Sequence, residues 1–247
     1  MTFDVVEILA GLLVALLIGF SKTGMPSFGM FGVAVMALVF PAKASVGIML
    51  PILLTGDLFA ITYYRRKVIW KHLIGLFPWV AVGLAGGYFV LEWSNNRALQ
   101  ILIGSIVLAL IVLHVLMKQL NMQLEEKISQ SFWFSASIGI LAGFTTMIGN
   151  AAGGIMTIYL LSKKLDKNAF IGTGAWFYFL VNLTKLPLYA TLGMITWHTL
   201  LFNLWMVPAV VTGAFIGINV LKKIPEAWFK WLILVLAALG AIRLLIG

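Results

Sequence analysis

Two polar segments interrupt the long apolar runs of this sequence and carry groups that could bind an anion. They are GFSKTGMPSFG, from Gly19, and GFTTMIGNAAG, from Gly143. Backbone N–H groups at glycines, together with hydroxyls and a lysine in an apolar setting, suit an anion with several oxygens. The candidate substrate-binding residues are Ser21, Lys22, Thr23, Gly24 and Ser27 in the first segment, and Thr145, Thr146, Gly149, Asn150 and Gly153 in the second.

Three polar residues elsewhere in apolar runs are candidates for coupling or ion pairing. A charge inside a membrane is costly, so a functional role is the first hypothesis for Lys22 and Asp57. Asp57 could form an ion pair with Lys22 or take up a proton during transport, and a purely structural pair is the alternative. Asn182 follows Asp57 by 125 residues, and Lys185 lies one helical turn later. Because Lys185 is four residues from Tyr189, near the end of its span, its ammonium could instead extend to the membrane surface.

Motifs for enzymatic and metal chemistry are missing from the sequence. It contains no Cys, no HExxH, no carboxylate pair within an apolar run and no GxxxxGK[ST]. Its three His residues do not cluster. We therefore expect no catalytic residues, no metal site and no cofactor, and we expect that the protein is not an enzyme.

The composition excludes a water-soluble globular protein. Of the 247 residues, 62% are hydrophobic and 10% are charged, whereas a soluble domain has about 45–50% apolar and about 25% charged residues. Continuous apolar runs predict α-helical spans in a lipid bilayer rather than a β-barrel. Membrane topology explains the net charge of +9, since the cytoplasmic loops of membrane proteins are rich in Lys and Arg. No nucleic-acid partner is therefore expected.

Apolar runs between polar breaks predict ten helical segments, four of which are too short to span a bilayer. At about 1.5 Å per residue, segments of about 11 to 16 residues cover about 17–24 Å, against a hydrocarbon core of about 30 Å. The short segments form two consecutive pairs, so each pair is predicted to be a helical hairpin that enters and leaves the membrane on one side. The first hairpin, 5–40, comprises segments 5–20 and 28–40, and the second, 132–161, comprises segments 132–144 and 151–161. The predicted spans are 45–64, 72–91, 98–117, 169–189, 199–221 and 227–246.

The distribution of positive charges predicts which loops lie on each side of the membrane. Twelve of the 17 Lys and Arg residues fall in one set of loops. By the positive-inside rule these loops are cytoplasmic, which places both termini outside. The twelve residues are Arg65, Arg66, Lys67, Lys71, Lys118, Lys127, Lys163, Lys164, Lys167, Lys222, Lys223 and Lys230.

The two polar segments belong to an internal repeat. The first repeat covers 1–120, a cytoplasmic linker covers 121–131 and the second repeat covers 132–247. Each repeat has one hairpin and three spans, so the second is predicted to be inverted, an arrangement typical of secondary transporters. Gly19, Phe20, Gly29 and Lys43 match Gly143, Phe144, Gly153 and Lys167 at an offset of 124, and Pro78, Gly83 and Gly87 match Pro208, Gly213 and Gly217 at an offset of 130. The glycines of the second group are predicted to let helices pack closely.

The segments GFSKTGMPSFGMFG and GFTTMIGNAAGGIM, about 124 residues apart, carry a family resemblance. On these segments the chain resembles the sulfite exporter TauE/SafE family, also called the toluene sulfonate uptake permease family. The likeness covers nearly the whole chain, although the family's breaks often carry longer glycine runs. The resemblance implies a multi-pass protein of the bacterial inner membrane that handles sulfite, sulfonates or related organosulfur anions.

These observations together predict a secondary transporter of small anions. It would work by alternating access around a midplane site between the two hairpins. Its expected partners are the anion, the lipid bilayer and a coupling proton or sodium ion. The alternative is an anion channel, or a membrane scaffold subunit that needs a partner protein.

Overall fold

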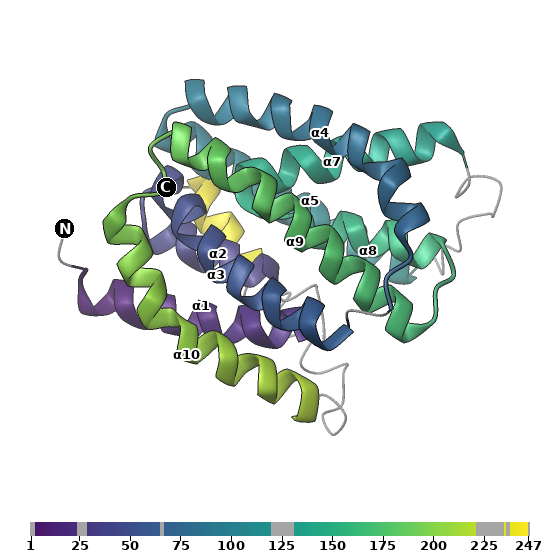
Figure 1. Cartoon of the computed structure of the whole chain (residues 1–247). Helices are drawn as coiled ribbons and strands as arrows, with labels where there is room; N and C mark the ends of the chain where they lie inside the picture. Colours follow the sequence, from purple (N-terminus) through teal and green to yellow (C-terminus); the bar gives the residue numbers. More distant parts are fainter. Residues whose placement is uncertain are drawn as a thin grey trace.

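The computed structural model of the chain is built from α-helices (Figure 1). It describes residues 3–23, 29–64, 67–119, 131–220, 235 and 238–246, and these residues contain no β-strand. The predicted all-α class is therefore confirmed. The helices are α1 (Val5–Thr23), α2 (Gly29–Val39), α3 (Ala42–Tyr64), α4 (Trp70–Trp93), α5 (Asn96–Gln119), α7 (Phe132–Gly149), α8 (Gly153–Ser162), α9 (Lys167–Thr191) and α10 (Trp197–Val220), and residues 238–246 are also helical.

Six of the described helices are long and apolar enough to cross a membrane, namely α1, α3, α4, α5, α7 and α10. Large apolar side chains such as Leu9, Ile74 and Leu204 are exposed on their outer faces, where a bilayer would cover them. The longest of the described helices, α9, has 25 residues, but polar residues such as Asn182 and Lys185 lower its hydropathy. This helix therefore carries polar groups into the middle of the protein.

Each predicted hairpin consists of one long and one short helix. α1 ends at Thr23 rather than at residue 20, and α7 ends at Gly149 rather than at residue 144. The extra residues include Ser, Thr and Lys, which the hydropathy pattern treats as a break. The hydroxyls of Thr23 and Thr145 are satisfied by the preceding helical turn, because Thr23 Oγ1 donates to the carbonyl of Gly19 and Thr145 Oγ1 to that of Leu141. Only α2 and α8, with 11 and 10 residues, are as short as predicted.

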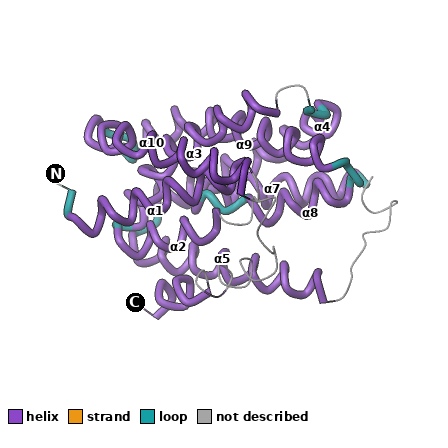
Figure 2. The backbone as a smooth tube through the Cα atoms, turned by 90° about the horizontal axis from the view of Figure 1, so that it is seen from below, coloured by secondary structure: helices purple, strands orange, loops and turns teal. Residues whose placement is uncertain are grey.

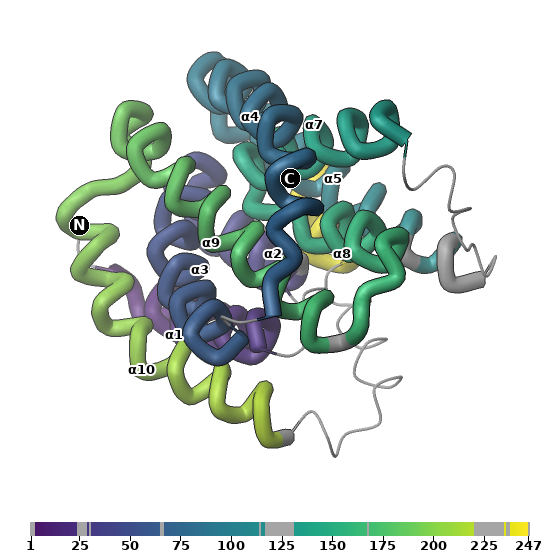
Figure 3. The backbone as a smooth tube through the Cα atoms, turned by 45° about the vertical axis from the view of Figure 1, so that its right-hand side comes forward, coloured from purple at the N-terminus to yellow at the C-terminus, as the bar shows by residue number. Residues whose placement is uncertain are grey.

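Two helix pairs are in close contact, α1 with α10 and α4 with α7 (Figures 1 and 3). A Cβ added to Gly19 would lie 2.8 Å from the backbone nitrogen of Ala214, and one added to Gly143 would lie 2.9 Å from that of Leu84. A backbone carbonyl oxygen lies closer still in both cases. The two glycines are 124 residues apart and their two partners 130 apart, which are the offsets of the repeat. The two glycines that the predicted repeat matches, Gly19 and Gly143, therefore make equivalent backbone contacts.

Glycines of α4 and α10 make the reciprocal contacts. Gly83 faces the backbone of Ile140 in α7, and Gly213 faces that of Leu16 in α1, which confirms their predicted packing role. α3 and α9 lie between the two close pairs (Figure 3), and α2 and α8 lie between these helices and α5 (Figure 2). Equivalent contacts of this kind are expected of two halves related by a two-fold axis, and the inversion itself stays a prediction.

Candidate functional site

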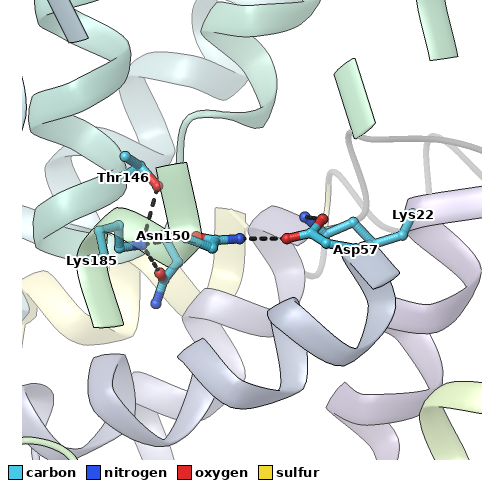
Figure 4. Close-up of polar contacts among 6 residues, drawn as sticks. Lys22, Asp57, Thr146, Asn150 and Lys185 are labelled. Carbon is cyan, nitrogen blue, oxygen red and sulfur yellow. Dashed lines mark hydrogen bonds and ion pairs between the residues drawn. The ribbon is translucent and has the colours of Figure 1, made fainter. Parts of the chain in front are cut away.

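Lys22 lies in the last turn of α1, and its ammonium group faces Asp57 of α3 (Figure 4) and Tyr178 of α9. Its Nζ is 2.6 Å from Oδ1 of Asp57 and 4.3 Å from the ring centre of Tyr178. The side chain is 11% exposed. Gly56 leaves room for the lysine, since a Cβ there would lie 3.1 Å from Lys22 Cγ. The partial negative charge of a helix C-terminus also favours a cation at this position.

Asp57, in the middle of α3, is completely buried and interacts with both halves of the chain. Its Oδ1 faces Lys22, while its Oδ2 accepts a hydrogen bond of 2.7 Å from Nδ2 of Asn182. Asn182 is the residue that the predicted repeat places opposite Asp57, at an offset of 125. The two positions that the predicted repeat matches are therefore in direct contact, as equivalent residues beside a two-fold axis would be.

Lys185 is also completely buried, so the expectation that it could reach the membrane surface is wrong. Its Nζ donates to Oδ1 of Asn182 at 3.2 Å, to Oγ1 of Thr146 at 3.3 Å and to Oδ1 of Asn150. Tyr189 provides no route outward, because it is itself buried and its hydroxyl donates to a backbone carbonyl of α7. Oxygen acceptors inside the protein thus satisfy the ammonium in place of water.

The break between α7 and α8 is shaped by Asn150, which caps α7 in the left-handed conformation with a φ of 55°. Asn tolerates this conformation better than most residues. Its Nδ2 donates to the carbonyl of Val46 in α3 at 3.1 Å, and its Oδ1 is thereby directed at Lys185. α8 begins at Gly153, and its N-cap residue Ala152 supplies no side-chain hydrogen bond. The first N–H groups of α8 therefore have no capping side chain from that residue.

A cavity of about 50 Å³ lies beside these groups and is lined by residues of both predicted repeats. One water molecule needs about 10–15 Å³ of such space, so the cavity has room for a few waters or a small polyatomic ion. Apolar side chains of Ile18, Leu53 and Leu160 form part of its wall. The predicted candidates that line it are Ser21, Lys22, Thr146, Asn150, Gly153 and Asn182.

Three predicted binding residues serve helix packing and do not line the cavity. Thr23 Oγ1 lies 3.0 Å from the carbonyl oxygen of Ala214 in α10, and Thr145 bonds within α7. Gly149 packs against α5, where an added Cβ would lie 3.4 Å from Ile103. Gly24 and Ser27 lie outside the described residues.

Asp57 and Lys185 do not line the cavity but contact residues that do. Asp57 is connected to the cavity through Lys22, and Lys185 through Thr146 and Asn182. The two charges therefore act on the cavity through residues that line it. In the described ranges, no group of three or more His, Asp or Glu side chains could hold a metal ion.

Two polar side chains that line the cavity, those of Tyr178 and Thr157, were not predicted from the sequence. Tyr178 lies one helical turn before Asn182 on α9, so helical spacing could have identified it. Thr157 lies in the second turn of α8, where its hydroxyl donates to the carbonyl of Gly153, and the apolar pattern of that helix contains no signal for it.

Comparison with known proteins identifies the family. The family model described as Sulfite exporter TauE/SafE matches residues 10–244, nearly the whole chain. Comparison with curated proteins and with solved structures found no match. Members of the matched family are membrane transporters, not enzymes, and the six long apolar helices agree with a multi-span membrane protein. The chain therefore belongs to the sulfite exporter TauE/SafE family, as its resemblance predicted.

Proposed function

We propose that this protein is a secondary transporter that moves small organosulfur anions, such as sulfite and sulfonates, by alternating access. One observation carries the proposal: the ammonium of Lys22 borders a cavity that residues of both predicted repeats line. A cation in the interior of a membrane protein commonly marks a substrate or ion path. The matched family supports the substrate class, since its model is described as a sulfite exporter.

The anion would bind between Lys22 and the beginning of α8. Lys22 supplies a full positive charge, and Ser21 and the first N–H groups of α8 add hydrogen-bond donors. Helix N-termini are suited to oxyanions because their N–H groups and their dipole both favour negative charge. Thr146 and Asn150 also line the cavity, but both accept hydrogen bonds from Lys185, so we assign them a supporting role.

Alternating access would come from relative movement of the two close helix pairs. α1 packs on α10 and α4 packs on α7 at backbone distance, so each pair would move as a unit. α3 and α9 lie between the pairs and meet through the hydrogen bond between Asp57 and Asn182. A shift at this contact would open the cavity first to one side and then to the other.

We further propose that the protein lies in the bacterial inner membrane with both termini outside. In Figure 1 the two termini lie at one end of the molecule with the α9–α10 connection, while α8 passes to α9 at the opposite end. Lys163 and Lys164 belong to this second connection. Loops rich in Lys and Arg face the cytoplasm, which supports this orientation.

The orientation can be tested with two single cysteines. Asn95 and Asn168 are exposed positions in the α4–α5 connection and in the first turn of α9, and the chain has no Cys to give a background signal. A cysteine at Asn95 should react with a membrane-impermeant maleimide on intact cells, and one at Asn168 only after permeabilisation. The reverse pattern would overturn the proposed orientation.

Transport itself is tested with the purified protein in liposomes. We expect saturable uptake of radiolabelled sulfite, competition by methanesulfonate, and faster exchange when unlabelled sulfite is present on the opposite side. Protein-free liposomes are the control. Flux without saturation or exchange would indicate a channel, and no flux of sulfite or of any tested sulfonate would contradict the proposed function.

A further inference from the structure

The charged groups buried beside the cavity do not balance. Within the part of the chain that the structure describes, they are Lys22, Asp57 and Lys185. Two cations and one carboxylate give a net charge of +1 when all three are ionised. Residues 24–28, which join α1 to α2, contain no charged side chain that could change this sum.

The hydrogen-bond partners of Lys185 match a charged ammonium. Its Nζ faces a hydroxyl and the Oδ1 atoms of Asn182 and Asn150. Both amides present oxygen to it, because their Nδ2 groups already donate to Asp57 and to the carbonyl of Val46. An ammonium has three N–H donors and no acceptor, and the three oxygens can accept from all three.

The helix ends at the two breaks add no net charge to this sum. α1 and α7 end there, and α2 and α8 begin there. A helix C-terminus carries about −0.5 of an elementary charge and an N-terminus about +0.5. The four partial charges therefore cancel, and the formal charges of the three side chains determine the balance.

We infer that Asp57 sets the charge of the transported anion, and that the site accepts anions with a single negative charge. This inference rests on the proposed function. A monoanion beside Lys22 brings the buried charge to zero, whereas a dianion leaves one negative charge uncompensated in a low-dielectric interior. The site therefore prefers sulfonates and hydrogen sulfite to sulfate.

Asp57 has this effect without touching the anion. It contacts Lys22 and Asn182, both of which line the cavity, and so acts as a positioning residue. The substitution Asp57→Asn preserves the shape of the side chain and raises the buried charge to +2. A merely structural role for Asp57 predicts lower stability, but it does not predict a changed preference for the charge of the ligand.

Methanesulfonate and sulfate are matched probes, because both are small and tetrahedral at sulfur while their charges are −1 and −2. Binding is measured as ligand-dependent thermal stabilisation of the purified protein in detergent, at constant ionic strength. The unaltered protein should bind methanesulfonate about a hundredfold more tightly than sulfate, the size of effect expected for one uncompensated charge in a membrane interior. Asp57→Asn should strengthen sulfate binding, relative to methanesulfonate binding, by about tenfold or more and so reduce the preference for the monoanion.

Controls separate this inference from the proposed function. Glu92→Gln removes an exposed carboxylate at the end of α4 and should leave the preference unchanged. Equal binding of both anions by the unaltered protein, or an unchanged preference in a folded Asp57→Asn variant, would overturn the charge assignment alone. If that variant does not fold, the charge assignment is tested by the preference of the unaltered protein for methanesulfonate over sulfate. Lys22→Gln should then weaken the binding of both ligands. A protein that binds neither anion and shows no flux would contradict the proposed function itself.

Discussion

Replacing Lys22 with glutamine is expected to reduce anion transport at low substrate concentration by about a hundredfold. The substitution removes the only charged side chain among the described residues that line the cavity, and it leaves Asp57 buried beside the site without its cation. An anion would then enter a site with no net positive charge, which should weaken its binding about a hundredfold. The initial rate of sulfite uptake into proteoliposomes, measured over a range of sulfite concentrations, checks this expectation.

Lys71→Gln is the matched control for this variant. Lys71 is exposed in the first turn of α4 and lies outside the cavity, so the substitution removes the same charge without changing the site. We expect uptake close to that of the unaltered protein. If Lys22→Gln instead forms a monodisperse protein with undiminished uptake, the anion does not depend on Lys22 and the site assignment is wrong.

Introducing a methyl group at Gly143 or Gly19 is expected to cause a large loss of stability. The new Cβ would meet backbone atoms of the facing helix, which cannot rotate away as a side chain can. The close pairs α4 with α7 and α1 with α10 would have to separate, at a cost of about 1–3 kcal/mol or more for each substitution. The thermal unfolding temperature in detergent and the yield of monodisperse protein measure the effect.

Gly75→Ala controls for the loss of a helical glycine as such. A Cβ at Gly75 in α4 would meet nothing within 4 Å, so the substitution should be neutral or stabilising by up to about 1 kcal/mol. If the two halves are equivalent, Gly19→Ala and Gly143→Ala should destabilise the protein by similar amounts. A protein in which either substitution is as harmless as Gly75→Ala would contradict the close helix contacts.

Local signals explain which parts of this fold could be predicted from the sequence. Long apolar runs indicate helical spans directly, and the all-α class follows from them. Lys22 and Asp57 could be singled out because a charge within an apolar run is unusual. An ion pair between them is one of the roles that the sequence suggests, since two opposite charges in a membrane interior stabilise each other.

The environment of Lys185 could not be predicted in the same way. Its partners Asn150 and Thr146 precede it by 35 and 39 residues and reach it only after α7 and α9 have packed together. The distance from Lys185 to the end of its helix suggested exposure, but tertiary contacts buried it completely. The ends of α1 and α7 were missed for a related reason, because hydroxyls bonded to their own helix allow polar residues to continue it.

The proposed function requires the anion to bind in the cavity between Lys22 and the start of α8. A crystal structure with bromomethanesulfonate, a monoanion whose bromine scatters anomalously, tests this claim most directly. We expect the anomalous peak in the cavity, with the sulfonate oxygens within hydrogen-bond distance of Lys22 Nζ. A bound sulfonate located elsewhere in the protein, with the cavity occupied only by water, would contradict the account.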